Sequence, residues 1–172
     1  MAQALHSFIL AFLAFAHSYC PQMPQEELQL LPVAIWEGSA HDLRTACTFT
    51  AMCQLESSMK VRKWFSDVKP NMDCAGTHND VLCLELYREG LITDSKRPNK
   101  SRQWWLWRKF FQQRPDVGTM IAARAFTRLA NRFGLDKTVQ MWKTGKVGNV
   151  NGILYLMQVK TLRAEMMKKC RR

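Results

Sequence analysis

The feature that most constrains the fold is an apolar stripe in the C-terminal half of the sequence. Ala122, Phe126, Leu129 and Phe133 recur at intervals of four, three and four residues, which places them on one face of an α-helix. Gly134 follows at the position where helices commonly end. A helix with one apolar face must bury that face against other elements, so this stripe predicts a packed helical core.

Most of the remaining sequence also divides into helical segments separated by short breaks. The pattern predicts helices over residues 33–59 with a break near Gly38 and Ser39, over 80–89, over 103–113, from Asp116 or Thr119 to Phe133, from Asp136 to Trp142, and from Asn151 onward. Residues 70–79 and 93–101 contain turn-forming residues and are expected to be loops. No segment alternates as a strand does, so the sequence predicts an all-α fold.

Near the N-terminus, residues 8–16 form a short apolar run. It is too short to span a bilayer, which requires about 20 apolar residues, but it matches the core of a signal peptide. We therefore expect residues 1–19 to be a signal peptide or hydrophobic leader, and the protein to be exported (periplasmic or extracellular) or virion-associated. The first seven residues carry no Lys or Arg, so two alternatives stay open: a helix packed on the domain, or a weak membrane anchor.

The length of 172 residues suits one domain with a single core. After the leader, the proline-containing residues 20–32 are expected to be irregular. Residues 33–167 then form the predicted helical domain, and residues 168–172 a basic tail.

The cysteines bear on the compartment of the protein. The chain has six cysteines and four histidines, without a Cys-x-x-Cys spacing, which argues against a zinc site. An even number of cysteines behind a leader favours disulfides and an oxidising compartment, although the pairing cannot be deduced. Small buried thiols are the alternative. No metal or other cofactor is expected.

The net charge of +11 favours a polyanionic partner, such as nucleic acid, anionic lipid or an anionic cell wall. Residues 96–114 concentrate this charge, with seven Lys or Arg, no acidic residue and five aromatic residues. Such a segment can stack on bases or sugars, or lie at a membrane surface. Most of its rings fit a buried stripe, which leaves Trp105 as the candidate for stacking on a ligand.

The first candidate for chemistry is Glu56. It continues an apolar helical face formed by Ala46, Phe49 and Cys53. A carboxyl on such a face loses hydration, which disfavours its charged form and suits a general acid. The alternative is a structural glutamate bonded to Ser57, Lys60 or a backbone amide.

Three segments of the sequence resemble the lytic transglycosylase (goose-type lysozyme-like) domain. Residues 51–57, Ala-Met-Cys-Gln-Leu-Glu-Ser, are similar to the Glu-Ser motif at the end of a helix in that family. Residues 122–134 are similar to its long helix, and Trp142-Lys143-Thr144-Gly145 stands where its Tyr-Asn-x-Gly motif is expected. Lys143 replaces Asn in this comparison, Trp142 lacks the phenolic hydroxyl, and no Gly-Leu-Met-Gln segment follows Glu56.

The resemblance implies a single lysozyme-like helical domain that cleaves peptidoglycan between N-acetylmuramic acid and N-acetylglucosamine. Glu56 would act alone, first as acid and then as base, and Ser57 would orient it. Trp142, Gly145 and Tyr155 would shape the saccharide groove. The implied partner is peptidoglycan, in a secretion, conjugation or virion assembly. The alternative from another class is a non-enzymatic basic protein, either nucleic-acid-binding or structural in a virion, that uses residues 96–114.

Overall fold

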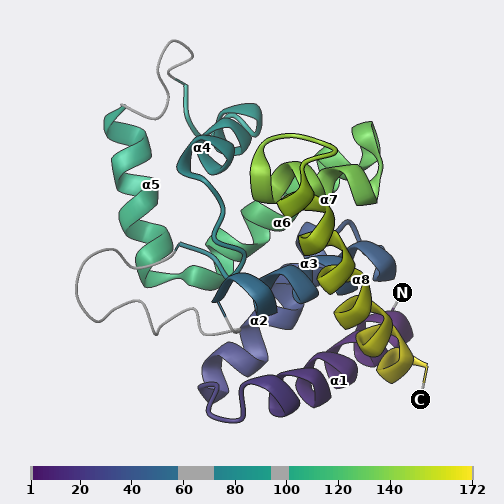
Figure 1. Cartoon of the computed structure of the whole chain (residues 1–172). Coiled ribbons are helices and arrows are strands. Elements are labelled where there is room, and N and C mark those ends of the chain that lie inside the picture. The colour runs from purple at the N-terminus through teal and green to yellow at the C-terminus, as the bar shows by residue number, and fades with distance from the viewer. Residues whose placement is uncertain (1, 58–71, 94–100, 172) are drawn as a thin grey trace.

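The computed structural model describes residues 2–57, 72–93 and 101–171, and within these ranges it contains eight α-helices and no strand (Figure 1). The predicted all-α class is therefore confirmed for the described residues. The helices, in chain order, are α1 (Ala2–Tyr19), α2 (Gln25–Gly38), α3 (Leu43–Ser57), α4 (Asn79–Arg88), α5 (Arg102–Gln113), α6 (Pro115–Phe133), α7 (Leu135–Thr144) and α8 (Val150–Cys170).

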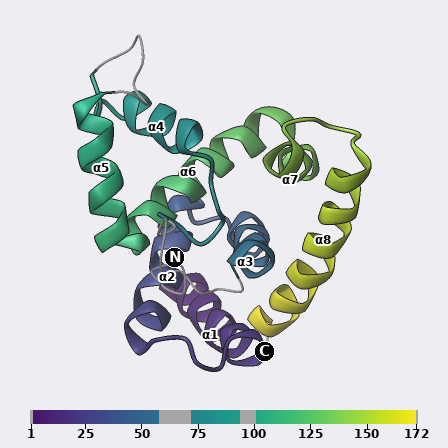
Figure 2. The ribbon, with the colours of Figure 1, turned by 60° about the vertical axis from the view of Figure 1, so that its left-hand side comes forward.

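Helix α3 is the centre of the fold. Figure 2 shows it surrounded by the other helices, and it contacts α1, α2, α6 and α8. Its residues Phe49, Met52 and Cys53 are fully buried, as are Thr48 and Thr50, so nearly every side of the helix is covered. Thr48 and Thr50 satisfy their hydroxyls by donating to backbone carbonyls one turn earlier in the helix.

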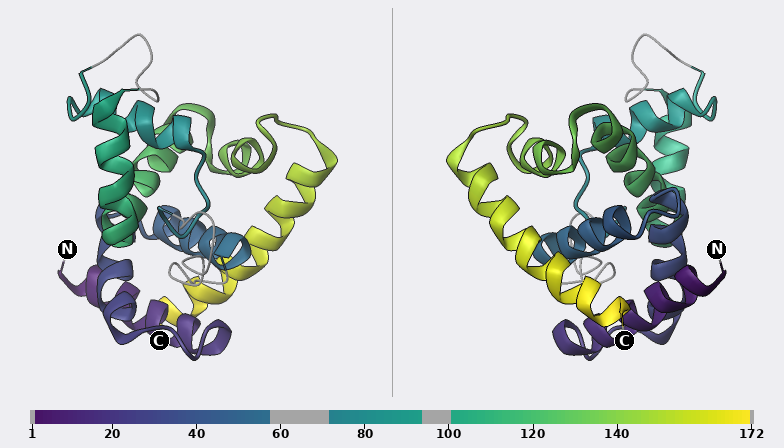
Figure 3. Two further views of the ribbon diagram at one scale, coloured as in Figure 1. Left: turned by 90° about the vertical axis from the view of Figure 1, so that its left-hand side faces the viewer. Right: turned by 90° about the vertical axis from the view of Figure 1, so that its right-hand side faces the viewer.

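The N-terminal helix α1 belongs to the same core. Phe8, Phe12 and Phe15 are fully buried, and the ring of Phe8 lies 5.5 Å from that of Trp36 in α2. Helix α1 also contacts α8, whose C-terminal end meets it in both views of Figure 3. This is the arrangement expected if residues 2–19 are a helix packed on the domain; export and cleavage stay predictions. None of the helices in the described residues is both long and apolar enough to cross a membrane.

Several predicted boundaries differ from the structure. The irregular segment ends at Pro24, because α2 begins at Gln25 and continues through Pro32. Glu26 and Glu27 lie in its first turn, where acidic residues stabilise the helix dipole. The predicted break after Gly38 is confirmed. The packed domain therefore begins before residue 33.

The later boundaries shift by a few residues. Pro115 takes the first position of α6, which its fixed φ suits, so the helix starts earlier than expected. Gly134 rather than Asp136 precedes α7, and Asn149 caps α8 by accepting from the amide of Asn151. The predicted basic tail continues α8 as far as Cys170.

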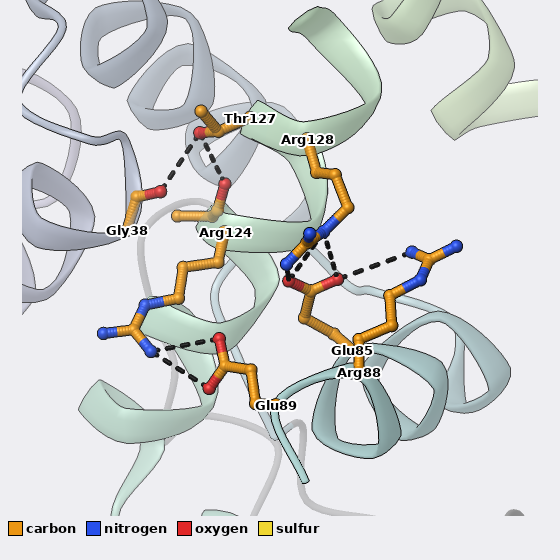
Figure 4. A network of polar contacts seen from close by, with 8 residues as sticks. Gly38, Glu85, Arg88, Glu89, Arg124, Thr127 and Arg128 are labelled. Carbon is orange, nitrogen blue, oxygen red and sulfur yellow. Dashed lines mark hydrogen bonds and ion pairs between the residues drawn. The ribbon is translucent and has the colours of Figure 1, made fainter. Parts of the chain in front are cut away.

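Ion pairs fix α4 against α6 (Figure 4). The carboxylate of Glu85 is fully buried, and Arg128 Nη2 donates a hydrogen bond to it at a distance of 2.6 Å. Arg88 approaches the same carboxylate to 3.6 Å. Directly after the end of α4, the side chain of Glu89 accepts from Arg124 Nη1 at 3.0 Å. Because a buried carboxylate needs a counter-charge, the two arginines of α6, Arg124 and Arg128, help to set the register of α6 against α4.

Helices α2 and α6 cross at a glycine. A Cβ at Gly38 would lie 2.5 Å from Ala123 Cβ and 2.5 Å from the carbonyl oxygen of Met120, so no larger residue fits there. The hydroxyl of Thr127 donates to the carbonyl of Gly38 at the same crossing (Figure 4). This close contact fixes α6 against α2, and α6 in turn packs against α7, which carries part of the candidate site.

Candidate active site

A cavity of about 530 Å³ opens at the C-terminal end of α3, between α7 and the segment that precedes and begins α4. Its size falls in the usual range for small-molecule sites. It is lined by Glu56, Ala75, Gly76, His78, Val81, Leu129, Met141, Trp142, Lys143 and Gly145. Three of the predicted site residues, Glu56, Trp142 and Gly145, are therefore brought together.

Glu56 reaches this cavity from the last turn of α3. Ala46, Phe49 and Cys53 are fully buried on the same face, as the spacing predicts, while the side chain of Glu56 is 21% exposed. The carboxylate thus stands at the rim of the core. The alternative partner Lys60 lies outside the described residues.

Lys143 is the partner of Glu56 in the structure. Its Nζ donates to Glu56 Oε1 at 3.0 Å and to Oε2 at 3.3 Å, across 87 residues of sequence. The same Nζ lies 5.2 Å from the centroid of the Tyr155 ring, a cation–π distance. An ion pair and an aromatic face therefore hold the ammonium of Lys143 at the cavity.

Tyr155 lies behind this pair. It is 5% exposed and is not among the residues that line the cavity. Its hydroxyl is buried beside the carboxylate of Glu56. Burial raises the pKa of the Tyr155 hydroxyl, and the nearby charge of Glu56 raises it further. Tyr155 supports Glu56 and Lys143 from the core side rather than forming the groove wall that the resemblance implies.

Trp142 and Gly145 form the α7 side of the cavity. The half-buried Trp142 packs edge-on against Phe126, with ring centroids 5.5 Å apart, and against Phe49 at 6.3 Å. This anchors its ring to the core while part of it faces the cavity. Gly145 ends α7 with a φ of +70°, a left-handed conformation that favours glycine.

The opposite wall is held by a disulfide. Cys53, three residues before Glu56, is bonded to Cys74. Gly76 follows with a φ of +60°, and a Cβ at this position would lie 3.7 Å from Glu56 Cβ and 3.9 Å from Oε2. The backbone at Gly76 therefore approaches the carboxylate closely. The four other cysteines are free thiols; Cys47 Sγ lies 3.9 Å from Cys170 Sγ.

Asp73 organises this wall from within. Its Oδ1 accepts from the amide of Ala75 at 2.8 Å and from the hydroxyl of Thr77 at 2.9 Å, and the amide of Thr77 also donates to the carboxylate. Its side chain is almost completely buried. Burial raises the pKa of Asp73 to about 6, an effect to which the charge of Glu56 adds and which the hydrogen bonds from Thr77 and Ala75 oppose.

The predicted stacking residue Trp105 does not join the site in the structure. Trp105 is 52% exposed on α5, with Lys109 Nζ 3.8 Å from its ring centroid, and it does not line the cavity. Ser57 ends α3, and its side chain lies outside the described residues, as do residues 96–100 of the basic segment. The described residues contain no group of three His, Cys, Asp or Glu side chains placed to hold a metal ion.

Sequence reasoning missed the wall formed by Asp73, Gly76 and His78. Residues 70–79 were expected to form a loop, but nothing in their composition places that loop beside Glu56. The pairing of Cys53 with Cys74 is the signal that would have done so, because Cys53 stands one helical turn before the candidate acid.

No protein-family model matches the sequence, no curated protein matches it, and no solved structure matches the fold. The function therefore has to be inferred from the site itself.

Proposed function

We propose that the protein is a peptidoglycan lytic transglycosylase-like enzyme with a lysozyme-like helical domain. It would cleave the bond between N-acetylmuramic acid and N-acetylglucosamine with Glu56 as the only acid and base. The observation that carries this proposal is the meeting of two distant segments. Glu56, at the end of the central helix, shares one cavity with Trp142 and Gly145, and these are the positions on which the sequence resemblance depends.

The proposed reaction needs two proton transfers at one carboxyl group. Glu56 in its protonated form donates to the glycosidic oxygen, and the bond from this oxygen to C1 of the muramoyl residue breaks. The resulting carboxylate then accepts the proton of the C6 hydroxyl, whose oxygen forms a new bond to C1. The product is a 1,6-anhydromuramoyl end, and no water is consumed.

Asp73 supports a single-acid reaction rather than hydrolysis. Glycoside hydrolysis usually needs a second carboxylate as base or nucleophile. Asp73 is a second carboxyl near Glu56, but it is 1% exposed and accepts hydrogen bonds within its own loop. It is therefore poorly placed to activate a water in the cavity, and its role is to position the wall around Gly76.

The other residues would bind the glycan. The part of Trp142 that lines the cavity offers an apolar surface for a pyranose ring, and Gly145 lies beside it. The net charge of +11 would attract the anionic wall. Export to an oxidising compartment is consistent with the Cys53–Cys74 disulfide. Action within a secretion, conjugation or virion assembly is part of this proposal.

The experiment that tests the function is release of soluble fragments from dye-labelled peptidoglycan. Glu56→Gln should reduce the rate about 100-fold or more, because it removes the acid and base without changing the size of the side chain. Glu37→Gln is the matched control, since Glu37 is exposed on α2, where it pairs with His41 and does not line the cavity. Equal rates for the wild type and Glu56→Gln would contradict the proposal.

The binding alternative rests on the exposed Trp105 and the Lys109 above it, which form a basic aromatic surface on α5. If folded protein releases no fragments, a polynucleotide affinity that falls steeply with salt would favour this alternative. Trp105→Ala should then weaken binding, while Glu56→Gln should not.

A further inference from the structure

The ion pair at the site raises a mechanistic difficulty. Both oxygens of Glu56 accept hydrogen bonds from Lys143 Nζ. A carboxyl engaged in this way cannot at the same time offer a proton to a glycosidic oxygen. Lys143 must therefore leave Glu56 before the first step of the proposed reaction.

Lys143 is able to leave. Its side chain is 43% exposed, and it lies in the last turn of α7, two residues before Gly145. Apart from Glu56, its described contact is the ring of Tyr155. Among the described residues that line the cavity, it is the only Lys or Arg. An anionic group of a ligand bound in the cavity would be a stronger partner for the released ammonium than a neutral group.

We propose that Lys143 is a carboxylate-recognition subsite, which exchanges Glu56 for a carboxylate of the bound glycan and so frees Glu56 for proton transfer. This inference rests on the proposed function and names the substrate feature that the site reads. The muramoyl residue offers two sources of a carboxylate close to the scissile bond. One is the lactyl group of strands without stem peptides, and the other is the stem peptide itself.

The exchange explains why a lysine can stand at this position. When the substrate is anionic, one lysine–carboxylate pair replaces another, and the freed Glu56 carboxylate takes up a proton from solvent to become the acid of the first step. A neutral glycan supplies no such partner and leaves Lys143 on Glu56. A hydrogen bond between charged groups contributes about 1.5–3 kcal/mol, so we expect at least a ~10-fold preference for carboxylated substrate.

The test compares three substrates: glycan strands with free lactyl carboxylates, the same strands after conversion of those carboxyls to methylamides, and peptidoglycan with its stem peptides. Each is given to the wild type, Lys143→Asn and Lys146→Asn. Lys146 is an exposed lysine three residues away that does not line the cavity, so its variant controls for the loss of one positive charge. Melting temperatures confirm that all three proteins are folded.

The expected result is a preference of ~10-fold or more in kcat/KM for one carboxylated substrate over the methylamide strands, retained by Lys146→Asn. In Lys143→Asn this ratio should fall to about one. Preference for free lactyl strands identifies the lactyl group as the source, and preference for peptidoglycan alone identifies the stem peptide. If Lys143→Asn kept the preference, the inference would be overturned. It would also be overturned if Lys143→Asn cleaved all three substrates faster than the wild type by the same factor.

Binding separates this inference from the proposed function. We would measure the affinities of a GlcNAc–MurNAc disaccharide, its methylamide and a muramoyl-peptide fragment by calorimetry with the same proteins. Absence of cleavage by every protein would contradict the proposed function. A Lys143-dependent preference for a carboxylated ligand would still establish the subsite, and equal affinities for all three ligands would contradict it.

Discussion

Cys53 and Cys74 are joined by a disulfide one helical turn before Glu56, although 21 positions separate them in the sequence. The bond fixes the segment that carries Asp73 and Gly76 against the end of α3. Because the backbone at Gly76 approaches the Glu56 carboxylate so closely, the disulfide sets the geometry on one side of the candidate acid.

Removing this disulfide should affect both stability and activity. We expect Cys53→Ser with Cys74→Ser to lower the free energy of unfolding by ~3 kcal/mol, the usual effect of opening a loop of this size. Release of peptidoglycan fragments should fall with it, because the wall at Gly76 is no longer held. Urea denaturation and the dye-release assay measure the two effects. Cys83→Ala, which removes a buried free thiol, is the control; unchanged activity in the double variant would show that the disulfide does not position the site.

Stability should also depend on the protonation of Asp73. Burial raises the pKa of Asp73 to about 6 in the folded protein, above the value of ~3.9 in unfolded chains. Between these values the folded protein binds a proton that the unfolded chain has lost, so this contribution to stability is present at pH 4 and is lost as the pH rises through 6. The loss is on the order of 2–3 kcal/mol.

Comparison with Asp73→Asn isolates this effect. The amide cannot titrate. The free energy of unfolding of the wild type, minus that of the variant, should therefore decrease between pH 4 and pH 7. Urea denaturation at several pH values gives this difference directly. Parallel stability curves for the two proteins would show that Asp73 does not carry a raised pKa.

The helices were predictable where one apolar stripe determines them. The stripe that ends at Phe133 and the face that leads to Glu56 depend only on residues three or four positions apart. The start of helix α2 was missed because Pro24 and Pro32 resemble a break. In the structure Pro24 directly precedes the helix and Pro32 lies within it. A proline by itself fits both a helix break and a helix, and the packing of the segment determines which of the two forms.

The partners within the site could not be read from the sequence. Lys143 was recognised only as an unusual residue in a motif, and its ion pair with Glu56 depends on how α7 and α3 pack. The disulfide partner of Cys53 was one of several choices. Trp105 was predicted to stack on a ligand because it lies outside the buried stripe of its helix. It is exposed as expected, but α5 does not line the cavity.

The N-terminal helix offers a test of the leader prediction. Phe8, Phe12 and Phe15 are fully buried in the structure, so deletion of residues 1–19 would remove three rings from the core. Even Phe12→Ala alone should cost about 3–5 kcal/mol. We therefore expect the shortened protein to show a much lower melting temperature by circular dichroism, with Leu13→Ala, at a more exposed position of α1, as a mild control. A shortened protein that is as stable as the full chain would instead support a cleavable leader.

The buried Glu85 predicts a second effect on stability. Arg128→Met removes its closest counter-charge, and a buried charge that loses its partner typically destabilises a protein by about 3 kcal/mol. Arg88, at 3.6 Å, limits the loss. Adding Glu85→Leu should restore much of the stability, because it removes the unpaired carboxylate. If the double variant were less stable than Arg128→Met in urea denaturation, the ion pair would not be the cause.

The most direct test of the central claim is mass spectrometry of the soluble products after incubation of the protein with peptidoglycan. The single-acid reaction at Glu56 predicts muropeptides that end in 1,6-anhydromuramic acid, and it predicts their loss in a folded Glu56→Gln variant. Products with reducing ends would contradict this account, because they require a water and a second group to activate it.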